Sequence, residues 1–433
     1  MEINIKLETS STGLNIRLEG TSWEAVKQMS FYAAEIEIQE IVKSIGLELT
    51  RKLMEAKGHA AEKKEAEVGI LSCKNTPSPG HYQTLYGSLS VNRHLYQSSE
   101  GGKTFCPLEA ACQLKFGSAT PLLAELIAFK ISSQTPAEIR EDLHKSHRLD
   151  LSAHYLSDLG HSVGAIALHQ VQEPPMSLPE PSPVAMRVIA TGMDGTTMPI
   201  VGEAYKEAMS GTIAFYDAQG ERQTTQYLGT MPQKGKSTFK QRFLQQVQQV
   251  LQAYPQAFHV CLGDGAPFNW NFMEAVFPQA VPILDFYHAC EHLQVIFEIL
   301  WGPQPPSARE EYAAWRETLK EQPHGVEELI TLFRMALSLP LTKSQRKRLL
   351  TELGYFLHNA HRMRYWYYLM AGYPIGSGVT EAACKELIKA RFGRSGMRWK
   401  RETGAKILQL RAIKLSKQWD LFWKEVMNLE QAA

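Results

Sequence analysis

The chain has 433 residues, 44% of them hydrophobic, and this length predicts two or three domains with cores of their own. Its formal net charge is only +1, so the overall charge says nothing about nucleic acid and the placement of the charges must be examined instead. The sequence shows no signal-peptide pattern, no apolar run approaching about 18 residues and no paired cysteine spacing. We therefore expect a cytoplasmic protein with free thiols and no membrane segment.

The first part of the chain, residues 1–118, is predicted to be an α+β region. Residues 3–18 alternate polar and apolar positions around a Ser-Ser-Thr-Gly turn, the pattern of a β-hairpin, and residues 82–97 predict a second strand pair. Between them, apolar residues at spacings of three and four predict a long helix with one apolar stripe: Ile38, Ile41, Val42, Ile45, Leu49 and Leu53. Such a stripe fits a helix packed into a core, or a helix that pairs with a second copy of the chain.

Residues 119–170 are predicted to form a helix-turn-helix. Thr135 stands at a helix cap, Pro136 at the first helical position and Glu138 in the first turn, and Ser152 begins a second short helix. Two short helices joined by a connection of this length have the size of a DNA-binding helix-turn-helix. The alternative is a plain helical packing unit.

The polar residues of this segment predict how it would bind DNA. The second helix would enter the major groove with His154 and its neighbours. Arg140, Lys145 and Arg148 would contact phosphates, which position a protein on DNA without reading its sequence.

A proline-rich segment, residues 171–185, has no helical or strand pattern and is predicted to be a linker. After it, residues 186–302 predict three strands, a helix, a strand, a helix, a strand and a helix. This order matches an RNase H-like fold, a mixed sheet with helices on both sides. Residues 303–372 are helical, charged and aromatic, and we interpret them as a helical insertion. Residues 373–433 then hold a loop, a helix at 379–392 and further basic helices.

Three carboxylates stand where this fold would bring them together. Asp194 ends one buried strand, Asp264 ends another, and Glu381 opens the helix after the loop. Two neighbouring carboxylates repel each other unless a cation lies between them, and oxygen ligands of this kind suit Mg²⁺ or Mn²⁺. Three carboxylates that hold two divalent ions are equipment for phosphoryl transfer. Each residue also has a structural interpretation, because an Asp before Gly is common in turns and a Glu in a first helical turn favours the helix dipole.

Asp285 and His288 follow the next strand. They fit either a capped helix start with a partly buried histidine, or a pair that supports the carboxylate site. Beyond them, the stretch from Lys385 to Lys424 is rich in Lys and Arg, with aromatic residues between. It fits a solvated helix face, or a surface that grips the phosphate backbone of DNA. Its expected DNA contacts are Arg391, Arg394, Arg398 and Trp399, and Trp399 would stack on an unpaired base or pack against the sheet.

Several enzyme classes are excluded by motif. The sequence has no phosphate-binding P-loop, no His-Glu-x-x-His zinc motif and no Gly-x-Ser-x-Gly nucleophile turn.

The sequence resembles the insertion-sequence transposases of the ISKra group, within the Mutator-like DDE superfamily. Four segments carry the resemblance: MDGTT at 193–197, GDG at 263–265, LDFYHA at 284–289 and YPIGSGVTEAACKELIKARFGRSGMRW at 373–399. The resemblance covers roughly residues 80–425. It implies that Asp194, Asp264 and Glu381 form a DDE triad that binds Mg²⁺, with Mn²⁺ as a substitute, and that Asp285 and His288 match the family's Asp-x-x-His signature.

The resemblance implies a transposase that cleaves and joins the strands of double-stranded DNA, at the terminal repeats of its element and at target DNA. It also implies a homo-oligomer on DNA, associated with the nucleoid. Relatives often carry paired cysteines around the segment Thr84 to Arg93, but here only Cys73 and Cys106 flank it, so no zinc is expected. The alternatives are a non-catalytic DNA-binding protein derived from a transposase, and a plain two-metal nuclease of the same fold.

Overall fold

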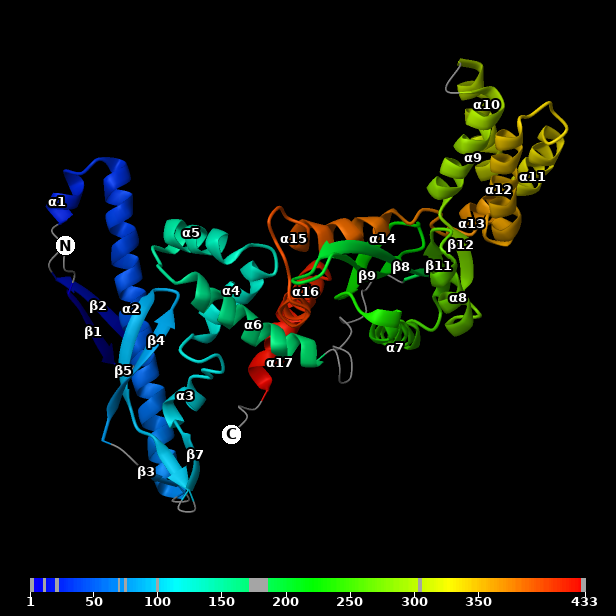
Figure 1. Cartoon of the computed structure of the whole chain (residues 1–433). Coiled ribbons are helices and arrows are strands. Elements are labelled where there is room, and N and C mark those ends of the chain that lie inside the picture. Colours follow the sequence, from blue (N-terminus) through cyan, green and yellow to red (C-terminus); the bar gives the residue numbers. More distant parts are fainter. Residues whose placement is uncertain are drawn as a thin grey trace. The chain divides into compact units, whose positions relative to one another are not determined.

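The computed structural model describes residues 4–10, 13–19, 23–68, 71–73, 76–98, 101–170, 186–302 and 306–429. The chain forms two compact units (Figure 1). The first consists of residues 1–166 with 423–433, and the second of residues 167–422. The predicted linker at 171–185 lies outside the described residues.

The first unit combines short β-sheets with helices. Its elements are β1 (Asn4–Ser10), β2 (Gly13–Glu19), α1 (Trp23–Lys27), α2 (Phe31–Val68), β3 (Leu71–Cys73), β4 (Ser78–Thr84), β5 (Gly87–Arg93), β6 (Tyr96–Ser98), β7 (Gly101–Phe105), α3 (Pro107–Ala111), α4 (Pro121–Ile131), α5 (Pro136–His147) and α6 (Ala153–Gln170). The hairpin expected at 3–18 is confirmed, since β1 and β2 pair antiparallel. The second hairpin, β4 with β5, spans 78–93 and so begins four residues earlier than predicted.

Helix α2 packs along one face. Met54 is buried in a cluster with residues of the second hairpin and α3. Two glycines let neighbouring side chains approach this face, since a Cβ added at Gly46 would lie 2.5 Å from the ring of Tyr86, and one at Gly58 would lie 2.8 Å from Leu108. The apolar stripe predicted from the sequence lies elsewhere: Ile38, Val42 and Leu53 are exposed, at 45%, 57% and 58%. For these residues the interpretation as a packed core stripe is wrong.

The helices expected in residues 119–170 are present as α4, α5 and α6. Glu138 N–H donates to Thr135 Oγ1 at 3.2 Å and Thr135 N–H donates to Glu138 Oε2 at 2.7 Å, so the cap that starts α5 is confirmed. Ser152 Oγ accepts from the N–H of Tyr155 at 3.1 Å. Helix α6 has 18 residues and is longer than the short helix expected there. The helix-turn-helix itself stays a prediction.

The end of helix α17 (Trp419–Asn428) belongs to the first unit. Lys115 Nζ donates to the carbonyl oxygens of Val426 at 2.9 Å and of Met427 at 2.7 Å, and also to that of Leu429. These are carbonyls that a helix end leaves without partners. The ring of Trp423 stacks on Phe116, with centroids 6.0 Å apart. Residues 423–429 are therefore held by the segment that follows α3.

The second unit contains a mixed five-stranded sheet, as the sequence predicted. Its strands are β8 (Val188–Pro199), β9 (Tyr205–Tyr216), β10 (Arg222–Thr230), β11 (Phe258–Gly263) and β12 (Val281–Leu284), in the order β10-β9-β8-β11-β12. Neighbours in β10-β9-β8 are antiparallel, and those in β8-β11-β12 are parallel. The apolar runs that predicted buried strands form its centre, where Val188 and Ile189 are fully buried.

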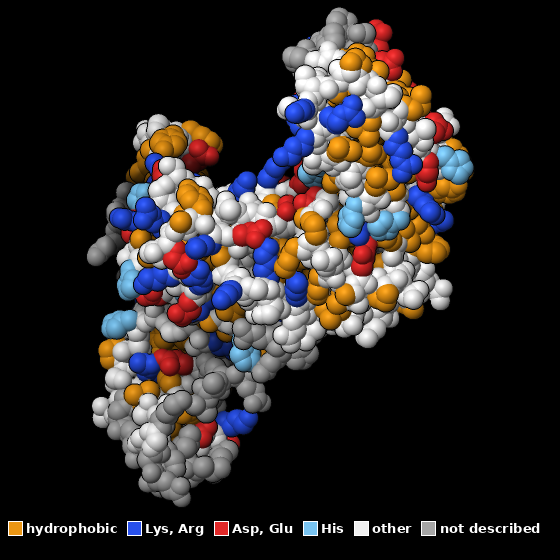
Figure 2. Space-filling view, turned by 45° about the vertical axis from the view of Figure 1, so that its right-hand side comes forward, with side chains coloured by type: hydrophobic (Ala, Val, Ile, Leu, Met, Phe, Trp, Pro, Cys, Tyr) orange, Lys and Arg blue, Asp and Glu red, His pale blue; other side chains and the backbone are white. Residues whose placement is uncertain are grey.

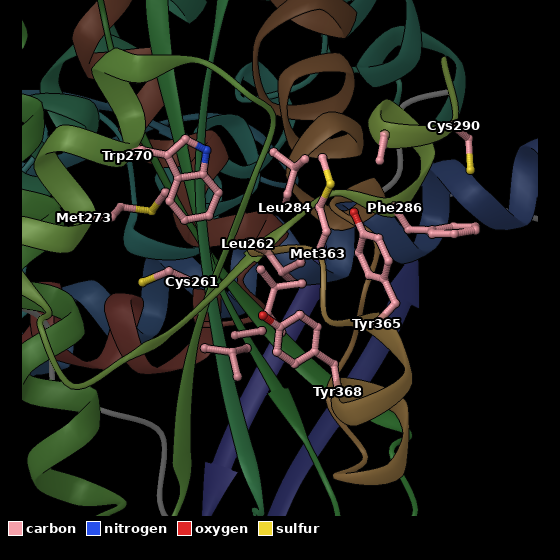
Figure 3. Packing of buried hydrophobic residues seen from close by; sticks show 14 of the residues in the cluster. Cys261, Leu262, Trp270, Met273, Leu284, Phe286, Cys290, Met363, Tyr365 and Tyr368 are labelled. Carbon is pink, nitrogen blue, oxygen red and sulfur yellow. The ribbon is translucent and has the colours of Figure 1, made fainter. Parts of the chain in front are cut away.

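Helices α7 (Ser237–Ala253), α8 (Pro267–Val276) and α9 (Phe286–Trp301) alternate with these strands. The amphipathic pattern expected at 236–253 is confirmed, because Phe239 and Phe243 of α7 are completely buried. A Cβ added at Gly211 of β9 would lie 2.7 Å from the ring of Phe243, so this glycine lets α7 approach the sheet. Figure 3 shows Trp270 and Met273 of α8 packed beside the sheet in the same apolar cluster.

Residues 306–370 form four helices, α10 (Pro306–Glu321), α11 (Gly325–Ala336), α12 (Lys343–Asn359) and α13 (Tyr365–Met370). Their apolar faces join the same core cluster as the sheet. Arg362, between α12 and α13, is 4% exposed and donates through Nε to Glu274 of α8 at 2.9 Å. Its guanidinium lies 4.4 Å from the centroid of the Trp270 ring. The helical segment is thus attached to the α8 side of the sheet.

The second unit ends with α14 (Gly378–Ala383), a π-helix at Cys384–Lys389, α15 (Ala390–Phe392) and α16 (Arg401–Leu415). The helix predicted at 379–392 is therefore present, with a π-helical section inside it. Among the helices of the described residues, none is long and apolar enough to cross a membrane.

Candidate active site

Asp194 lies within β8 and Asp264 directly follows β11, at equivalent positions of these two neighbouring parallel strands. Strands β8 and β11 pair with a constant offset of 70 residues, as in Thr191 opposite Cys261. Asp194 and Asp264 have this same offset. Parallel neighbours in a sheet lie about 4.8 Å apart, so the register brings both carboxylates to one edge of the sheet. The prediction that Asp264 follows the end of its strand is confirmed, but the prediction that Asp194 ends its strand is wrong, because β8 continues to Pro199 beside β9.

Asp194 lies in a partly buried environment with two donors. The Gly195 N–H donates to Oδ1 at 2.6 Å, and the Cys384 thiol donates to Oδ2 at 3.3 Å. Burial raises the pKa of Asp194, and the negative charges of Asp264 and Glu381 add to this rise. The three carboxylates are thus close enough to influence one another, and a cation between them would relieve the repulsion.

Asp264 lies in the turn between β11 and α8. Its Oδ1 accepts from the Ala266 N–H at 3.1 Å and from Asn269 Nδ2 at 3.4 Å. Asn269 Nδ2 also donates to the Met193 carbonyl at 3.2 Å. Asn269 is buried. Because its amide donates to both groups, it ties the Asp264 turn after β11 to the β8 backbone just before Asp194.

Glu381 lies on α14, which packs directly on the sheet. Thr380 Oγ1 lies 2.8 Å from Thr212 Oγ1 of β9. A Cβ added at Gly192 of β8 would lie 2.3 Å from Thr380 Oγ1, so the missing side chain allows this close approach. Ser377 Oγ donates to Glu381 Oε1 at 3.2 Å. The position of Glu381 therefore depends on the contact between Thr380 and strands β8 and β9.

The helix that carries Glu381 continues into the π-helix at Cys384–Lys389. Single π turns inside α-helices are rare and are frequent at functional sites. Cys384, its first residue, is the donor to Asp194. The π-helix thus begins at the contact between this helix and the carboxylate of β8.

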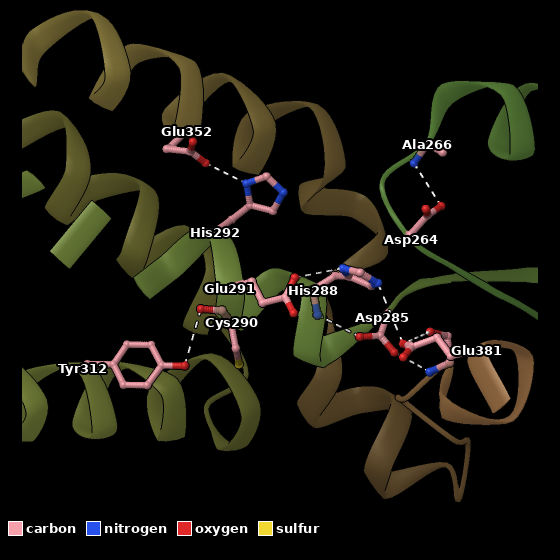
Figure 4. A network of polar contacts seen from close by, with 11 residues as sticks. Asp264, Ala266, Asp285, His288, Cys290, Glu291, His292, Tyr312, Glu352 and Glu381 are labelled. Carbon is pink, nitrogen blue, oxygen red and sulfur yellow. Dashed lines mark hydrogen bonds and ion pairs between the residues drawn. The ribbon is translucent and has the colours of Figure 1, made fainter. Parts of the chain in front are cut away.

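Asp285 and His288 lie with Glu381. Among the described residues, these three form a group whose possible ligand atoms all lie within 4.8 Å of one another. Asp285 is fully buried; it caps α9 by accepting from the His288 N–H at 2.8 Å and also accepts from the Ser377 N–H. His288 Nε2 is 3.8 Å from Glu381 Oε1, and its Nδ1 is 3.2 Å from Glu291 Oε2. Figure 4 shows His288 between the two glutamates, with Asp264 apart from them and bonded to Ala266.

Sequence reasoning missed several neighbours of these groups. Cys384 stands one helical turn after Glu381, a spacing that could have indicated it. Tyr355 comes from α12 and lies against the Asp264 turn, since a Cβ added at Gly265 would be 2.5 Å from its ring. The imidazole of His292 stacks on the ring of Tyr355, with ring centroids 3.6 Å apart. These two residues are far apart in the sequence, so no local pattern could have paired them.

The residues expected to bind DNA in the first unit lie on or beside α5 and α6. Arg140 and Lys145 are exposed on α5, and Arg148 ends that helix in a left-handed conformation with φ of 51°. The side chain of His154 is 88% exposed, and its Nε2 is 3.1 Å from Asp158 Oδ2. To contact a base, His154 would have to break its pairing with Asp158, or bind the base together with Asp158.

The expectation for Arg391 needs correction. Arg391 is 3% exposed, and its guanidinium lies 4.8 Å from the centroid of the Trp399 ring. Trp399 in turn packs on Phe392, with ring centroids 4.5 Å apart, and its carbonyl accepts from the Val201 N–H at 3.0 Å. A buried guanidinium over an aromatic ring is held by the fold and does not reach a phosphate.

The other two arginines of that segment differ. Arg398 is exposed and Arg394 is partly exposed, so both stay expected phosphate contacts. Figure 2 shows Lys and Arg side chains interspersed with acidic and apolar ones over the face in view, without one continuous basic patch. This distribution agrees with the net charge of +1.

Comparison of the sequence with protein-family models and with curated proteins found no match. The case for a function therefore rests on the residues and their geometry.

The donor set fits a divalent metal that prefers oxygen. Asp194, Asp264 and Glu381 supply carboxylates, and burial, with smaller effects from the charges of the other two, raises the pKa of Asp194. Mg²⁺ and Mn²⁺ accept such ligands and keep several waters. His288, beside Glu381, could add a nitrogen ligand, which Mn²⁺ tolerates better than Mg²⁺.

Proposed function

We propose that the chain is a DNA transposase of the DDE type, which uses divalent metal ions to cleave DNA strands and transfer them. The observation that carries the proposal is the equal placement of Asp194 and Asp264 on neighbouring parallel strands, with Glu381 close enough to affect the pKa of Asp194. The strand order β10-β9-β8-β11-β12, antiparallel and then parallel, supports an RNase H-like core. The resemblance to the ISKra group in the same segments supports the finer assignment.

In this proposal the chain's own residues hold and orient the ligands. Gly195 and Cys384 fix the two oxygens of Asp194, Asn269 orients Asp264, and Ser377 donates to Glu381. Bound divalent ions would supply the chemistry of lowering the pKa of an attacking water or 3′-hydroxyl and stabilising the leaving oxygen.

Asp285 and His288 act as positioning residues. The buried carboxylate of Asp285 joins the start of α9 to the loop before α14 through its bonds to the N–H groups of His288 and Ser377. His288 then faces Glu381. This pair would hold the loop, and with it Glu381, at the edge of the sheet that carries the other carboxylates.

The test is cleavage of a duplex that carries the DNA flanking the gene, with Mg²⁺, beside a gel shift on the same duplex. Asp194→Ala, Asp264→Ala and Glu381→Ala should each abolish cleavage and leave binding intact, because carboxylates hold metals and not phosphates. Glu386→Gln, an exposed carboxylate on the same helix, is the matched control and should cleave normally. Normal cleavage by any of the three alanine variants would remove that residue from the triad.

Metal titration separates the remaining outcomes. Ca²⁺ should support binding but not cleavage, since it prefers longer bonds and looser geometry. Calorimetric titration of Mn²⁺ should show binding that is lost in Asp194→Ala. DNA binding without cleavage in any metal would favour a DNA-binding protein derived from a transposase, and cleavage without strand transfer would favour a plain nuclease.

A further inference from the structure

Helix α2 presents two apolar faces: one packs against the second hairpin and α3, and the other carries exposed apolar residues. An α-helix turns by about 100° per residue, so Leu47, Met54 and Gly58 lie within about 20° of one direction. This is the face against the second hairpin and α3. The same rotation per residue places three other residues within about 20° of the opposite direction: Ile38, Ile45 and Phe31, which is exposed at the start of the helix.

This second face has the spacing of a coiled-coil seam. Alternating steps of four and three residues run through positions that we call the seam: Phe31, Glu35, Ile38, Val42, Ile45, Leu49, Lys52 and Ala56. Such a/d spacing leads two helices to pair along their length. Phe31, Ile38 and Val42 are 81%, 45% and 57% exposed, while Ile45 and Leu49 are half-buried. The seam therefore presents its apolar surface mainly in its first half.

The seam is complementary to itself when reversed. In an antiparallel pair centred between Lys43 and Ser44, Ile38 meets Leu49 of the second copy and Val42 meets its Ile45. By the same symmetry the large Phe31 meets the small Ala56, and the acidic Glu35 meets the basic Lys52. Every seam position therefore finds a partner of suitable size or opposite charge.

Charge decides the direction of pairing. Glu35 and Lys52 are both exposed on α2. In a parallel pair Glu35 would face Glu35 of the other copy, and Lys52 would face Lys52, and like charges repel at such positions. The antiparallel arrangement replaces these contacts with two Glu–Lys pairs per dimer.

We propose that the exposed face of α2 binds α2 of a second copy of this chain, as an antiparallel coiled coil along the seam. The occupant is a second copy because the size and charge pattern of the seam matches its own reversal. This dimer joins first units and does not depend on the carboxylate site of the second unit, so it stands or falls separately from the proposed transposase function.

The first test is the mass of the full chain in solution by sedimentation equilibrium. We expect a dimer at micromolar concentration. Ile38→Glu should raise the dissociation constant by at least about a hundredfold, because it places a carboxylate among apolar side chains. Lys64→Glu, an exposed charge reversal on the same helix but beyond the seam, is the control and should leave the dimer unchanged.

Charge reversal tests the pairing of Glu35 with Lys52. Glu35→Lys and Lys52→Glu should each raise the dissociation constant roughly tenfold, since each turns two attractive pairs into repulsive ones. The double variant should return to the wild-type value. Both residues are exposed, so these variants should keep the fold, which circular dichroism checks. A double variant no tighter than the single ones would overturn the antiparallel register.

Disulfide cross-linking tests direction independently, in a Cys73→Ser background because Cys73 is exposed. Ile38→Cys with Leu49→Cys should form a covalent dimer, while either change alone should not. In the antiparallel pair, two copies of residue 38 lie about 16 Å apart along the helix, beyond the reach of a disulfide. Cross-linking by a single variant would mean parallel pairing, and a wild-type monomer at all concentrations up to about 100 µM would refute the proposal.

Discussion

Glycine at position 192 controls how closely the helix with Glu381 approaches the sheet. The backbone at Gly192 has no positive φ, so alanine can adopt it, and the effect of Gly192→Ala comes from the added Cβ. This atom would lie 2.3 Å from Thr380 Oγ1 and 3.0 Å from the Leu262 carbonyl oxygen. Ordinary contacts begin near 3.4 Å, so Thr380 or its helix must retreat by about 1 Å.

Two energies oppose each other in this substitution. Overpacking of a buried contact costs about 1–3 kcal/mol, while replacing glycine in a strand gains about 0.5–1 kcal/mol. We therefore expect a net loss of up to about 2.5 kcal/mol in urea unfolding. Activity should fall further, because Glu381 is the next residue after Thr380, and a displacement of about 1 Å at a catalytic group costs on the order of a hundredfold in rate.

A second substitution makes this reasoning refutable. Thr380→Ala removes the oxygen that the new Cβ meets, at a cost of about 1 kcal/mol for the lost bond to Thr212. In Gly192→Ala with Thr380→Ala, stability and Mg²⁺-dependent cleavage should both recover relative to Gly192→Ala. If the two losses simply add, residues 192 and 380 are not coupled, and the contact does not set the position of Glu381.

Three further predictions concern buried groups of the second unit. Tyr355→Phe removes a hydroxyl that is buried without a hydrogen-bond partner among the described residues, so the free energy of unfolding in urea should stay the same or rise; a loss above about 1 kcal/mol would mean that the hydroxyl has a partner. Glu274→Ala leaves the buried guanidinium of Arg362 without the acceptor of its 2.9 Å bond and should cost about 2 kcal/mol, whereas Glu274→Gln should cost less; equal losses would contradict the charge argument. Burial lowers the pKa of His259 from 6.5 to about 4, so the fold favours the neutral imidazole. The free energy of unfolding is therefore unaffected by this group above pH 6.5 and decreases as the pH falls from 6.5 toward 4. His259→Asn should therefore reduce the fall in melting temperature across that window, and an unchanged slope would show that another group is responsible.

The strands of the second unit could be predicted because their sequence leaves little choice. Runs such as VIATGM before Asp194 and FHVCLG before Asp264 are too apolar to lie on a surface and too short for buried helices. The neighbouring placement of β8 and β11 followed from the expected order of elements, but the turn expected at Asp194 is absent, because β8 continues to Pro199 beside β9. The edge of the sheet that carries the site was therefore predictable from the sequence.

Other features depend on what lies beside a residue, which a local pattern does not contain. The spacing of Ile38, Val42 and Leu53 predicted a helix correctly, but spacing does not tell which face of the helix its neighbours cover. Arg391 was expected to contact a phosphate because it lies in a stretch rich in Lys and Arg, yet its guanidinium is buried over the ring of Trp399. The approach of Tyr355 to Gly265 joins positions separated by a whole helical segment.

The return of residues 423–429 to the first unit has a consequence for synthesis on the ribosome. The segment around Lys115 and Phe116 emerges early, but Trp423 and the carbonyls that Lys115 binds emerge only after the whole second unit has been translated. Until then the first unit is missing one of its helices, with Phe116 uncovered on that side. Translation of residues 423–429 thus completes the first unit after the second, so a nascent chain stalled in between would be a target for chaperones and proteases.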